Sequence, residues 1–230
     1  VQINADQIPL ARLTLGDSFW NKRFNIAHFA WELPVFPDRW KNSFNFFNEI
    51  WTPSKFCTDA ISEKTTKNVY TMPFGVSADV QEPRDREYFE LPSDKFLFLC
   101  MFDVNSVIQR KNPMGAIKAF QRAFNPNCKD VELIVKINNY TENKIGYKEL
   151  YESISGWSNI RIIDKVLTKN DINALIECCN SFVSLHRSEG FGLVMAEAML
   201  LKKPVIATNW SSNTDFMNFY NSCPVDYKLV

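Results

Sequence analysis

Residues 184–208 read Ser-Leu-His-Arg-Ser-Glu-Gly-Phe-Gly-Leu-Val-Met-Ala-Glu-Ala-Met-Leu-Leu-Lys-Lys-Pro-Val-Ile-Ala-Thr. The pattern predicts a strand that ends at Leu185, a polar turn in which Gly190 and Gly192 flank Phe191, and a helix directly after it. Glycines at such a turn let the backbone approach a ligand closely, and the helix N-terminus offers unpaired N–H groups to a phosphate or a sugar hydroxyl. The stretch therefore predicts a ligand site at a βα turn. The structural alternative is that the glycines only permit a tight turn.

Glu197 lies in the middle of the predicted helix, among Leu, Val, Met and Ala side chains. A carboxylate on such an apolar helix is costly to bury unless it has hydrogen-bond partners. A pair of ligand hydroxyls is one such partner, and a solvated groove is the alternative environment. The segment is not the dinucleotide-binding G-x-G-x-x-G pattern, because Val194 and Met195 stand where the last glycine is expected.

Outward from this stretch, short apolar or β-branched runs alternate with helical patterns. This alternation predicts βαβ units, and hence an α/β fold with a Rossmann-like parallel sheet that carries helices on both faces. Thr168, with Asp171 three residues later, is a helix-start signal. The predicted strands are Phe24–Ala30, Asn68–Met72, Lys95–Phe102, Val131–Ile137, Asn159–Asp164, Ser181–Leu185 and Pro204–Thr208. The predicted helices are Pro113–Phe124, Lys148–Ser155, Lys169–Cys179 and Gly192–Leu201.

The composition excludes several classes of protein. The 230 residues carry 26 basic and 26 acidic side chains, and this zero net charge argues against a duplex nucleic-acid binder, which normally has a basic excess. A hydrophobic share of 46% indicates a packed globule rather than a disordered chain. The longest apolar run, Phe96–Phe102, is far shorter than the roughly 18 residues of a membrane span, so no transmembrane segment is expected. The first residue, Val1, indicates a processed chain or a part of a longer one.

The six cysteines form no Cys-x-x-Cys pair and have two histidines to help them. They are expected to be reduced thiols rather than metal ligands or disulfide partners, with Cys178 and Cys179 on a buried helix face. This cysteine usage predicts a cytoplasmic location.

The segment 73–94 interrupts the alternation with prolines, a glycine and a mixed-charge run, and predicts a connection over the surface. We expect residues 1–75 to be the C-terminal part of an incomplete N-terminal domain, with too few strands for a sheet of their own. Residues 76–94 would be an interdomain linker. Residues 95–230 would be a nearly continuous α/β domain, incomplete at its end in one interpretation.

Glu189 and Glu197 are separated by seven residues and precede Lys-Pro-Val-Ile-Ala-Thr. This block resembles the signature of family 4 (group 1) glycosyltransferases. Residues 98–124, with Arg-Lys-Asn-Pro at 110–113, resemble the first strand, phosphate loop and helix of that family's donor domain. Residues 31–37 and 50–56 resemble the late part of its acceptor domain, and Met-Pro-Phe-Gly-Val at 72–76 resembles the lead into its linker. The resemblance covers nearly the whole chain.

The resemblance implies a GT-B fold whose donor domain is the Rossmann-like one, beside an incomplete second α/β domain. It implies a retaining transferase that moves a sugar from a nucleotide-diphosphate sugar to a hydroxyl of a glycan or related acceptor. Glu197 would accept hydrogen bonds from the donor ribose, and Glu189 would contact the donor sugar beside the reacting carbon. The backbone of residues 190–192 would lie against the sugar and its phosphate.

The resemblance also assigns the rest of the donor. Lys111, with Arg110, would neutralise the diphosphate leaving group, a role that grows as the glycosidic bond breaks. The nucleotide base would stack on the residues after the strand that ends at Asp164, which are Lys165, Val166 and Leu167.

One position departs from the family pattern. The family usually has Gly-Arg shortly before the lysine, and here Asn105 and Ser106 stand there. Phosphate neutralisation then depends on Arg110 and Lys111. The alternative is an ordinary solvated pair at a helix start, but a cation there opposes the helix dipole, which favours an anionic ligand nearby.

His28 ends a predicted strand and Glu32 follows in a proline-rich turn, on an edge that faces the cleft in GT-B enzymes. Either is a candidate to orient the acceptor hydroxyl or to act as acid or base. The alternative for His28 is a hydrogen-bonded core residue within an aromatic strand. Aromatic residues that recur at helical spacing are expected to be core, namely Trp40, Phe44, Phe47 and Trp51.

Absent motifs narrow the chemistry. The chain has no Asp-x-Asp, so the metal–diphosphate site of GT-A transferases is not expected, and the reaction is predicted to need neither a metal nor another cofactor. Nucleoside triphosphatase and α/β-hydrolase motifs are missing as well. Paired glutamates also suit a glycosidase, but here one lies at a turn and the other inside a helix.

Two other functions stay open: a nucleotide-sugar epimerase of the same fold, and a non-catalytic nucleotide-sugar-binding module. The expected partners are a nucleotide-sugar donor and a glycan or lipid-linked sugar acceptor, with no nucleic acid. Peripheral membrane association through a lipid-linked acceptor is the alternative to a purely cytoplasmic location.

Overall fold

The structure, a computed structural model, describes residues 3–21, 23–138 and 145–229. The chain forms two compact units. The first holds residues 1–75 with the short segments 188–192 and 211–215, and the second holds residues 76–187, 193–210 and 216–230. Every strand pair among the described residues is parallel, which confirms the predicted α/β class.

The second unit is built on a six-stranded sheet with the strand order β6-β5-β4-β7-β8-β9. Its centre is β4 (Phe96–Asp103), which pairs along its whole length with β5 (Val131–Asn138) and on its other side with β7. All five strands predicted for this region are present. The remaining strands are β6 (Ile160–Ile163), β7 (Ser181–Ser184), β8 (Val205–Thr208) and the unpredicted edge strand β9 (Cys223–Val225).

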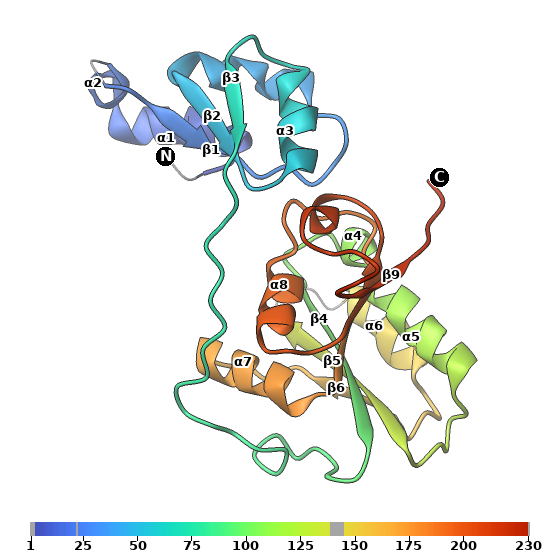
Figure 1. Ribbon diagram of the computed structural model, residues 1–230. Helices are drawn as coiled ribbons and strands as arrows, with labels where there is room; N and C mark the ends of the chain where they lie inside the picture. The colour runs from blue at the N-terminus through green and yellow to red at the C-terminus, as the bar shows by residue number, and fades with distance from the viewer. Residues whose placement is uncertain (1–2, 22, 139–144, 230) are drawn as a thin grey trace. The chain divides into compact units, whose positions relative to one another are not determined.

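Helices cover both faces of this sheet, as the sequence predicted. α5 (Pro113–Ala123) and α6 (Ile145–Ser153) lie on one face, and α7 (Lys169–Cys178) and α8 (Leu193–Leu200) lie on the other (Figure 1). Each pair buries its own cluster of apolar side chains against the strands. One cluster includes Ile117, Phe120, Leu133, Val135 and Leu150, and the other includes Leu97, Leu99, Leu175, Ile176, Met195 and Ala198.

Local chemistry fixes the start of α7. The side chain of Thr168 accepts a hydrogen bond from the backbone N–H of Asp171 at 3.1 Å, which is the cap that the sequence predicted. The Thr168 hydroxyl also donates to the Asp171 carboxylate at 2.8 Å. The first turn of α7 is therefore held in one conformation.

The first unit contains a three-stranded parallel sheet in the order β1-β2-β3. The expectation of too few strands for a sheet in residues 1–75 was therefore wrong, because β2 was not recognised. This central strand pairs through Ile50 with Ala27 on one side and Val69 on the other. The strands are β1 (Ile26–His28), β2 (Glu49–Thr52) and β3 (Asn68–Thr71). The helices are η1 (Ala5–Gln7), α1 (Ile8–Leu15), α2 (Asp17–Trp20), η2 (Asp38–Phe46) and α3 (Lys55–Ser62).

Aromatic side chains form the core of this unit. Phe29 and Phe47 meet edge to face with ring centroids 5.4 Å apart, a geometry that aromatic pairs prefer. Phe44 and Phe47 are buried, as expected. The expectation that the helical spacing extends to Trp51 was wrong, because the 3₁₀-helix η2 ends at Phe46 and Trp51 lies in β2.

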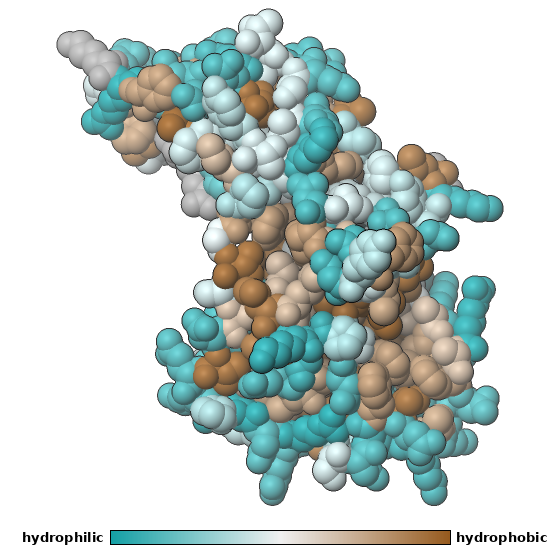
Figure 2. All heavy atoms as spheres, in the orientation of Figure 1, coloured by the Kyte–Doolittle hydropathy of each residue, from teal (hydrophilic) through white to brown (hydrophobic). Residues whose placement is uncertain are grey.

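The surface of the second unit is mixed. Hydrophilic side chains cover its lower part in the space-filling view, and hydrophobic ones reach the surface above them (Figure 2). Exposed apolar side chains of this unit include Val166, Leu193 and Leu200. All six cysteines are free thiols. Among the described residues, no helix combines the length and the hydropathy needed to cross a bilayer.

Candidate functional site

Glu197 lies on the second turn of α8 with its side chain buried at 4% exposure. Its carboxylate oxygen Oε1 accepts a hydrogen bond from Nζ of Lys169, the first residue of α7, at 2.5 Å. The ammonium group is on the more exposed side, since the Lys169 side chain is 59% exposed. Burial of a carboxylate requires such compensation. The expected acidic group is thus present at the sheet edge where α7 begins, and Lys169 is a partner that the sequence had not indicated.

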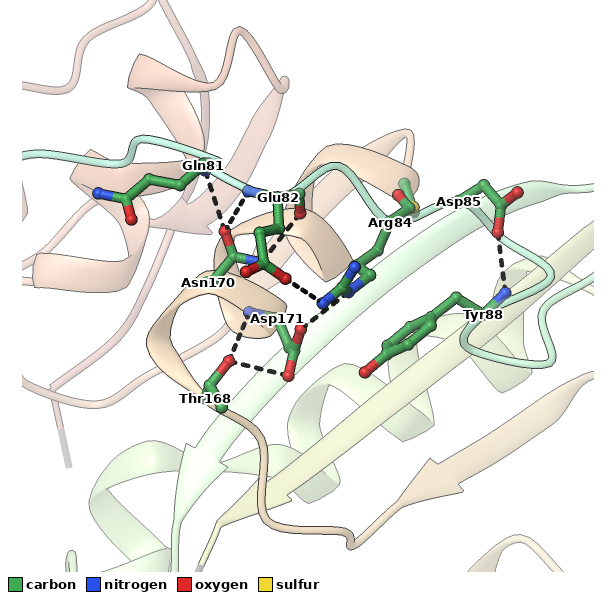
Figure 3. A network of polar contacts seen from close by, with 9 residues as sticks. Gln81, Glu82, Arg84, Asp85, Tyr88, Thr168, Asn170 and Asp171 are labelled. Carbon is green, nitrogen blue, oxygen red and sulfur yellow. Dashed lines mark hydrogen bonds and ion pairs between the residues drawn. The ribbon is translucent and has the colours of Figure 1, made fainter.

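The first turn of α7 also binds the connection that precedes β4. Asn170 accepts hydrogen bonds through Oδ1 from the backbone N–H groups of Gln81 and Glu82, both at 3.0 Å, and donates to the carbonyl of Glu82 at 2.9 Å. The guanidinium of Arg84 reaches Asp171 at 3.4 Å (Figure 3). Hydrogen bonds lower the pKa of Asp171, the largest contribution coming from Thr168. Residues 79–84 therefore run along α7 as an ordered strap.

The residues predicted to contact the base follow the end of β6. Lys165, Val166 and Leu167 line a cavity of about 470 Å³ together with Tyr88, Phe89 and Glu90. Val166 is 90% exposed, whereas Leu167 packs against the apolar cluster under α7. Lys165 forms an exposed ion pair with Glu90 at 3.2 Å. The cavity is thus bounded by one exposed aliphatic side chain, Val166, and one half-buried one, Leu167.

Arg110 and Lys111 form the last turn of the short helix α4 (Ile108–Lys111), between β4 and α5. Both residues were expected at the start of the following helix. That expectation is wrong, because Asn112, which has a left-handed backbone (φ 51°, ψ 48°), separates α4 from α5. The Asn112 side chain donates to the carbonyl of Leu185 at 2.7 Å. The N–H of Arg187 donates to the carbonyl of Arg110 at 2.8 Å. The loop with both cations is thus fixed to the end of β7.

A cavity of about 580 Å³ opens beside this loop. Asn112 and the first turn of α5 line it, and three charged side chains reach it: Lys118, Glu149 and Arg187. The turn after β4, where the family usually has Gly-Arg, is closed by the side chain of Asp103, which accepts from the N–H of Asn105 at 2.8 Å. Asn105 and Ser106 supply no cation, whereas Arg110, Lys111, Lys118 and Arg187 are basic residues that the structure describes in or near this loop.

The loop with Glu189 belongs to the first unit. Glu189 is buried, its N–H donates to Oγ of Ser211 at 2.9 Å, and its carbonyl accepts from Oγ of Ser212 at 2.7 Å. The next carbonyl, of Gly190, accepts from Oγ of Ser54 at 2.9 Å. Gly192 has φ +91°, a conformation that favours glycine. Hydrogen bonds between serine side chains and the backbone therefore hold the loop that carries Glu189.

Residues from the N-terminal part of the first unit also contact the loop that carries Glu189. Cys57 donates through Sγ to the carbonyls of Trp31 at 2.9 Å and Gly190 at 3.1 Å, and burial raises the pKa of this thiol. The carbonyl of Glu32 accepts a short hydrogen bond from Ser188. A Cβ atom on Gly190 would lie 3.4 Å from Cγ of Glu32. Glu32 and the Glu189 loop are therefore neighbours within the first unit.

His28 lies at the end of β1 and is half-buried. Its Nε2 is 3.3 Å from the carbonyl of Met72, and its ring meets Phe74 edge to face at 4.9 Å. Phe74 in turn contacts the ring of Phe191 at 5.3 Å. The histidine thus has the hydrogen bond expected of a structural residue, and the aromatic chain connects it to the glycine loop.

Lys136 is a buried cation that no pattern in the sequence indicated. It lies on β5 with no exposed surface, and its Nζ donates to the carbonyl of Ile137 at 2.6 Å and to Oδ1 of Asn138 at 2.8 Å. Burial lowers the pKa of this lysine to about 8, although Asp164 and Asp103 act in the opposite direction. A lysine inside a β-branched run gives no signal of burial in the sequence.

The second unit brings several predicted donor residues to one edge of its sheet. Arg110 and Lys111 follow β4, Lys165–Leu167 follow β6, and Lys169 holds Glu197 from the start of α7. Carboxyl ends of parallel strands meet at one edge, and ligands of such sheets bind where the strand order reverses. Here the chain passes from β4 outward to β6 and returns to β7 on the other side of β4.

The model of the family "Glycosyl transferases group 1" matches residues 81–219. No curated protein sequence matches the chain. Among solved structures, Anabaena HepE in complex with UDP-glucose is similar with a TM-score of 0.76 at 16% identity, over 97% of this chain and 63% of HepE.

Two further structures are similar at low identity. A UDP-forming α,α-trehalose-phosphate synthase from Burkholderia vietnamiensis has a TM-score of 0.72 at 12% identity, over 91% of this chain and 57% of its own. TarM has a TM-score of 0.67 at 14% identity, over 90% of this chain and 42% of its own. The chain therefore spans less than two thirds of each of these proteins. The similarities confirm the predicted GT-B-type fold.

Proposed function

The chain belongs to the group 1 glycosyl transferases, and on that premise we propose that it binds a nucleotide-diphosphate sugar and transfers the sugar to a hydroxyl acceptor. The observation that carries the proposal is the buried carboxylate of Glu197 at the edge of the parallel sheet where α7 begins. A carboxylate accepts hydrogen bonds, and the two hydroxyls of a ribose can donate them, so a buried carboxylate at this edge suits a ribose. HepE is described in complex with UDP-glucose and the Burkholderia synthase as UDP-forming, so a UDP-sugar is the donor we propose.

The diphosphate would bind at the loop between β4 and α5. Lys111 would be the main cation there, and Arg110 would take over the role of the loop arginine that Asn105 and Ser106 replace. Cations at this place stabilise the charge that develops on the leaving phosphate as the bond to the sugar breaks. The base would lie on Val166 and Leu167, beside the cavity of about 470 Å³.

Glu189 would act on the donor sugar beside the reacting carbon, with the backbone of Gly190 and Gly192 near the sugar and phosphate. The acceptor would be a hydroxyl of a glycan or of a lipid-linked sugar. His28 and Glu32 are the candidates to orient it or to take its proton. Positioning by these groups and charge stabilisation by Lys111 would supply the catalysis. A retaining course follows the resemblance to the family, and the absence of Asp-x-Asp from the sequence supports a reaction without a metal ion.

Product analysis tests this function. The protein is incubated with UDP-glucose in EDTA, with and without glycan acceptors, and both UDP release and the identity of the sugar are followed. We expect UDP release in EDTA that Lys111→Ala and Glu197→Gln abolish, whereas the exposed controls Lys129→Ala and Glu177→Gln keep it. Conversion of the sugar without UDP release would instead identify an epimerase, and binding with no product in any assay would identify a binding module.

A further inference from the structure

The ion pair between Lys169 and Glu197 joins the first residue of α7 to the second turn of α8. Nζ of Lys169 lies 2.5 Å from Oε1 of Glu197. The carboxylate is on the buried side of the contact, at 4% exposure, and the ammonium on the solvent side, at 59%. Within the described part of the chain, Lys169 is the residue whose side chain donates to this carboxylate, and it binds one of the two oxygens.

The position of Lys169 is unfavourable for a helix by itself. A cation directly after the N-cap lies at the positive end of the helix dipole. The neighbouring residues hold this turn nonetheless: Thr168 caps it, Asn170 binds the strap at Gln81 and Glu82, and Asp171 contacts Arg84 (Figure 3). The backbone of Lys169 is thus fixed on both sides, and its side chain contacts the buried carboxylate of Glu197. This contact offsets the unfavourable position of the cation at the helix start.

We propose that Lys169 is a positioning residue for the donor ribose. Its contact with Oε1 fixes the position and the plane of the Glu197 carboxylate, so that the ribose hydroxyls meet an oriented acceptor. The inference rests on the proposed role of Glu197 in donor binding. Lys169 itself touches no reacting atom in this account.

The number of hydrogen bonds that the Glu197 carboxylate can accept supports a positioning role for Lys169, rather than competition between Lys169 and the ribose for this carboxylate. An ionised carboxylate offers about four lone-pair sites, and Lys169 uses one of them on Oε1. Two ribose hydroxyls can then bind while the ion pair stays in place. Without Lys169 the carboxylate loses the side-chain contact that orients it. Loss of the cation should therefore weaken the contribution of the hydroxyls and leave the rest of the donor site unchanged.

Calorimetric titrations with UDP and with 2′,3′-dideoxy-UDP test the proposal. The variants are Lys169→Met, which keeps the length of the side chain but not its charge, Lys169→Arg, which keeps the charge, and Glu197→Gln. Lys148→Met is the matched control, because Lys148 is another exposed lysine of this unit that pairs with a glutamate, Glu152 at 3.7 Å. Circular dichroism of each variant establishes that it is folded.

Lys169→Met is expected to bind UDP about tenfold more weakly, which equals about 1.4 kcal/mol, and to bind the dideoxy analogue as the wild type does. Lys169→Arg should recover most of the UDP affinity, and Lys148→Met should match the wild type. Lys169→Met in the Glu197→Gln background should have no further effect on UDP binding, because the partner is already lost.

Other outcomes would distinguish a failure of the positioning role of Lys169 from a failure of the proposed donor site. If Glu197→Gln weakens UDP binding but Lys169→Met binds UDP as tightly as or more tightly than the wild type, the positioning role is wrong and the donor site stands. An equal loss for UDP and the dideoxy analogue would likewise contradict it, since that pattern indicates a structural role. If the wild type binds no UDP, or Glu197→Gln binds it normally, both the inference and the proposed function are overturned.

Discussion

The hydroxyl of Ser54 donates to the carbonyl of Gly190 at 2.9 Å and, with the same oxygen, accepts from the N–H of Cys57 at 3.2 Å. One buried oxygen thus caps α3 and holds the loop that carries Glu189. The N–H of Lys55, the first residue of α3, donates to Asp215 at 2.6 Å. The start of α3 therefore fixes two segments that lie far later in the chain.

Replacement of Ser54 tests this double role. Ser54→Ala removes the cap and one hydrogen bond to Gly190, and should lower the free energy of unfolding by about 1–2 kcal/mol. Ser62→Ala is the control, because Ser62 is exposed at the other end of α3 and alanine is a good helix former. Urea unfolding measures both variants. Equal stabilities of the two would contradict the role of Ser54.

The two glycines of the loop should respond differently to alanine. Gly192→Ala forces a Cβ atom into a backbone with φ +91°, which should cost about 1–2 kcal/mol. Gly190→Ala introduces a Cβ atom whose nearest neighbour is at 3.4 Å, an ordinary contact, so stability should change little. Urea midpoints of both variants decide the matter, and a Gly192→Ala variant as stable as Gly190→Ala would show that the loop conformation is wrong.

Lys136 should make stability rise at alkaline pH. Its pKa is lowered from 10.5 to about 8 in the folded protein, so between these values the unfolded chain binds more protons than the folded one. The free energy of unfolding must then increase with pH through this window. Lys136→Met lacks the effect, so the stability of the wild type relative to this variant should grow by roughly 2 kcal/mol between pH 7 and pH 10. Urea unfolding of both proteins at pH 7 and pH 10 measures the difference between their free energies of unfolding. The same difference at both pH values would contradict a buried Lys136 with a lowered pKa.

The reactivity of the cysteine thiols should depend on their exposure to solvent. Burial raises the pKa of Cys100 and Cys179 to about 12, and a protonated buried thiol is a poor nucleophile. Cys223 is exposed. In the native protein, a disulfide reagent at pH 8 should react first at Cys223, and Cys223→Ser should remove this fast phase. All six thiols should react in urea, and rapid native labelling of Cys100 or Cys179 would contradict the packing.

The sequence predicted the second unit well because its strands, above all the long β4 and β5, are apolar or β-branched runs between clear helix signals. Thr168 and Asp171 marked the start of α7 correctly. β9 escaped notice because it has three residues, one of them Pro224, and such an edge strand has too few side chains to form a pattern. The strand β2 was missed because Trp51 continued an apparently helical aromatic spacing, although the chain leaves η2 at Phe46.

Part of the candidate site could also be predicted. The apolar surroundings of Glu197 indicated a buried carboxylate in need of a partner, and the structure contains one. Lys169 itself could have been noticed as a cation at the position where the helix dipole disfavours it. The role of Ser54 at Gly190 could not be predicted, because a contact between residues so distant in sequence leaves no local pattern. Lys136 was hidden for a related reason, since its burial results from the strands on either side.

The central claim is that Glu197 and Lys111 belong to a site for a nucleoside diphosphate. The most direct measurement is thermal unfolding of the wild type, Glu197→Gln and Lys111→Ala with UDP at increasing concentration, beside the controls Glu177→Gln and Lys129→Ala. UDP at about a hundred times its dissociation constant should stabilise the wild type and both controls by roughly 2.7 kcal/mol. The account predicts that Glu197→Gln and Lys111→Ala lose most of this stabilisation. Stabilisation of all five proteins to the same extent, or of none of them by UDP, would contradict it.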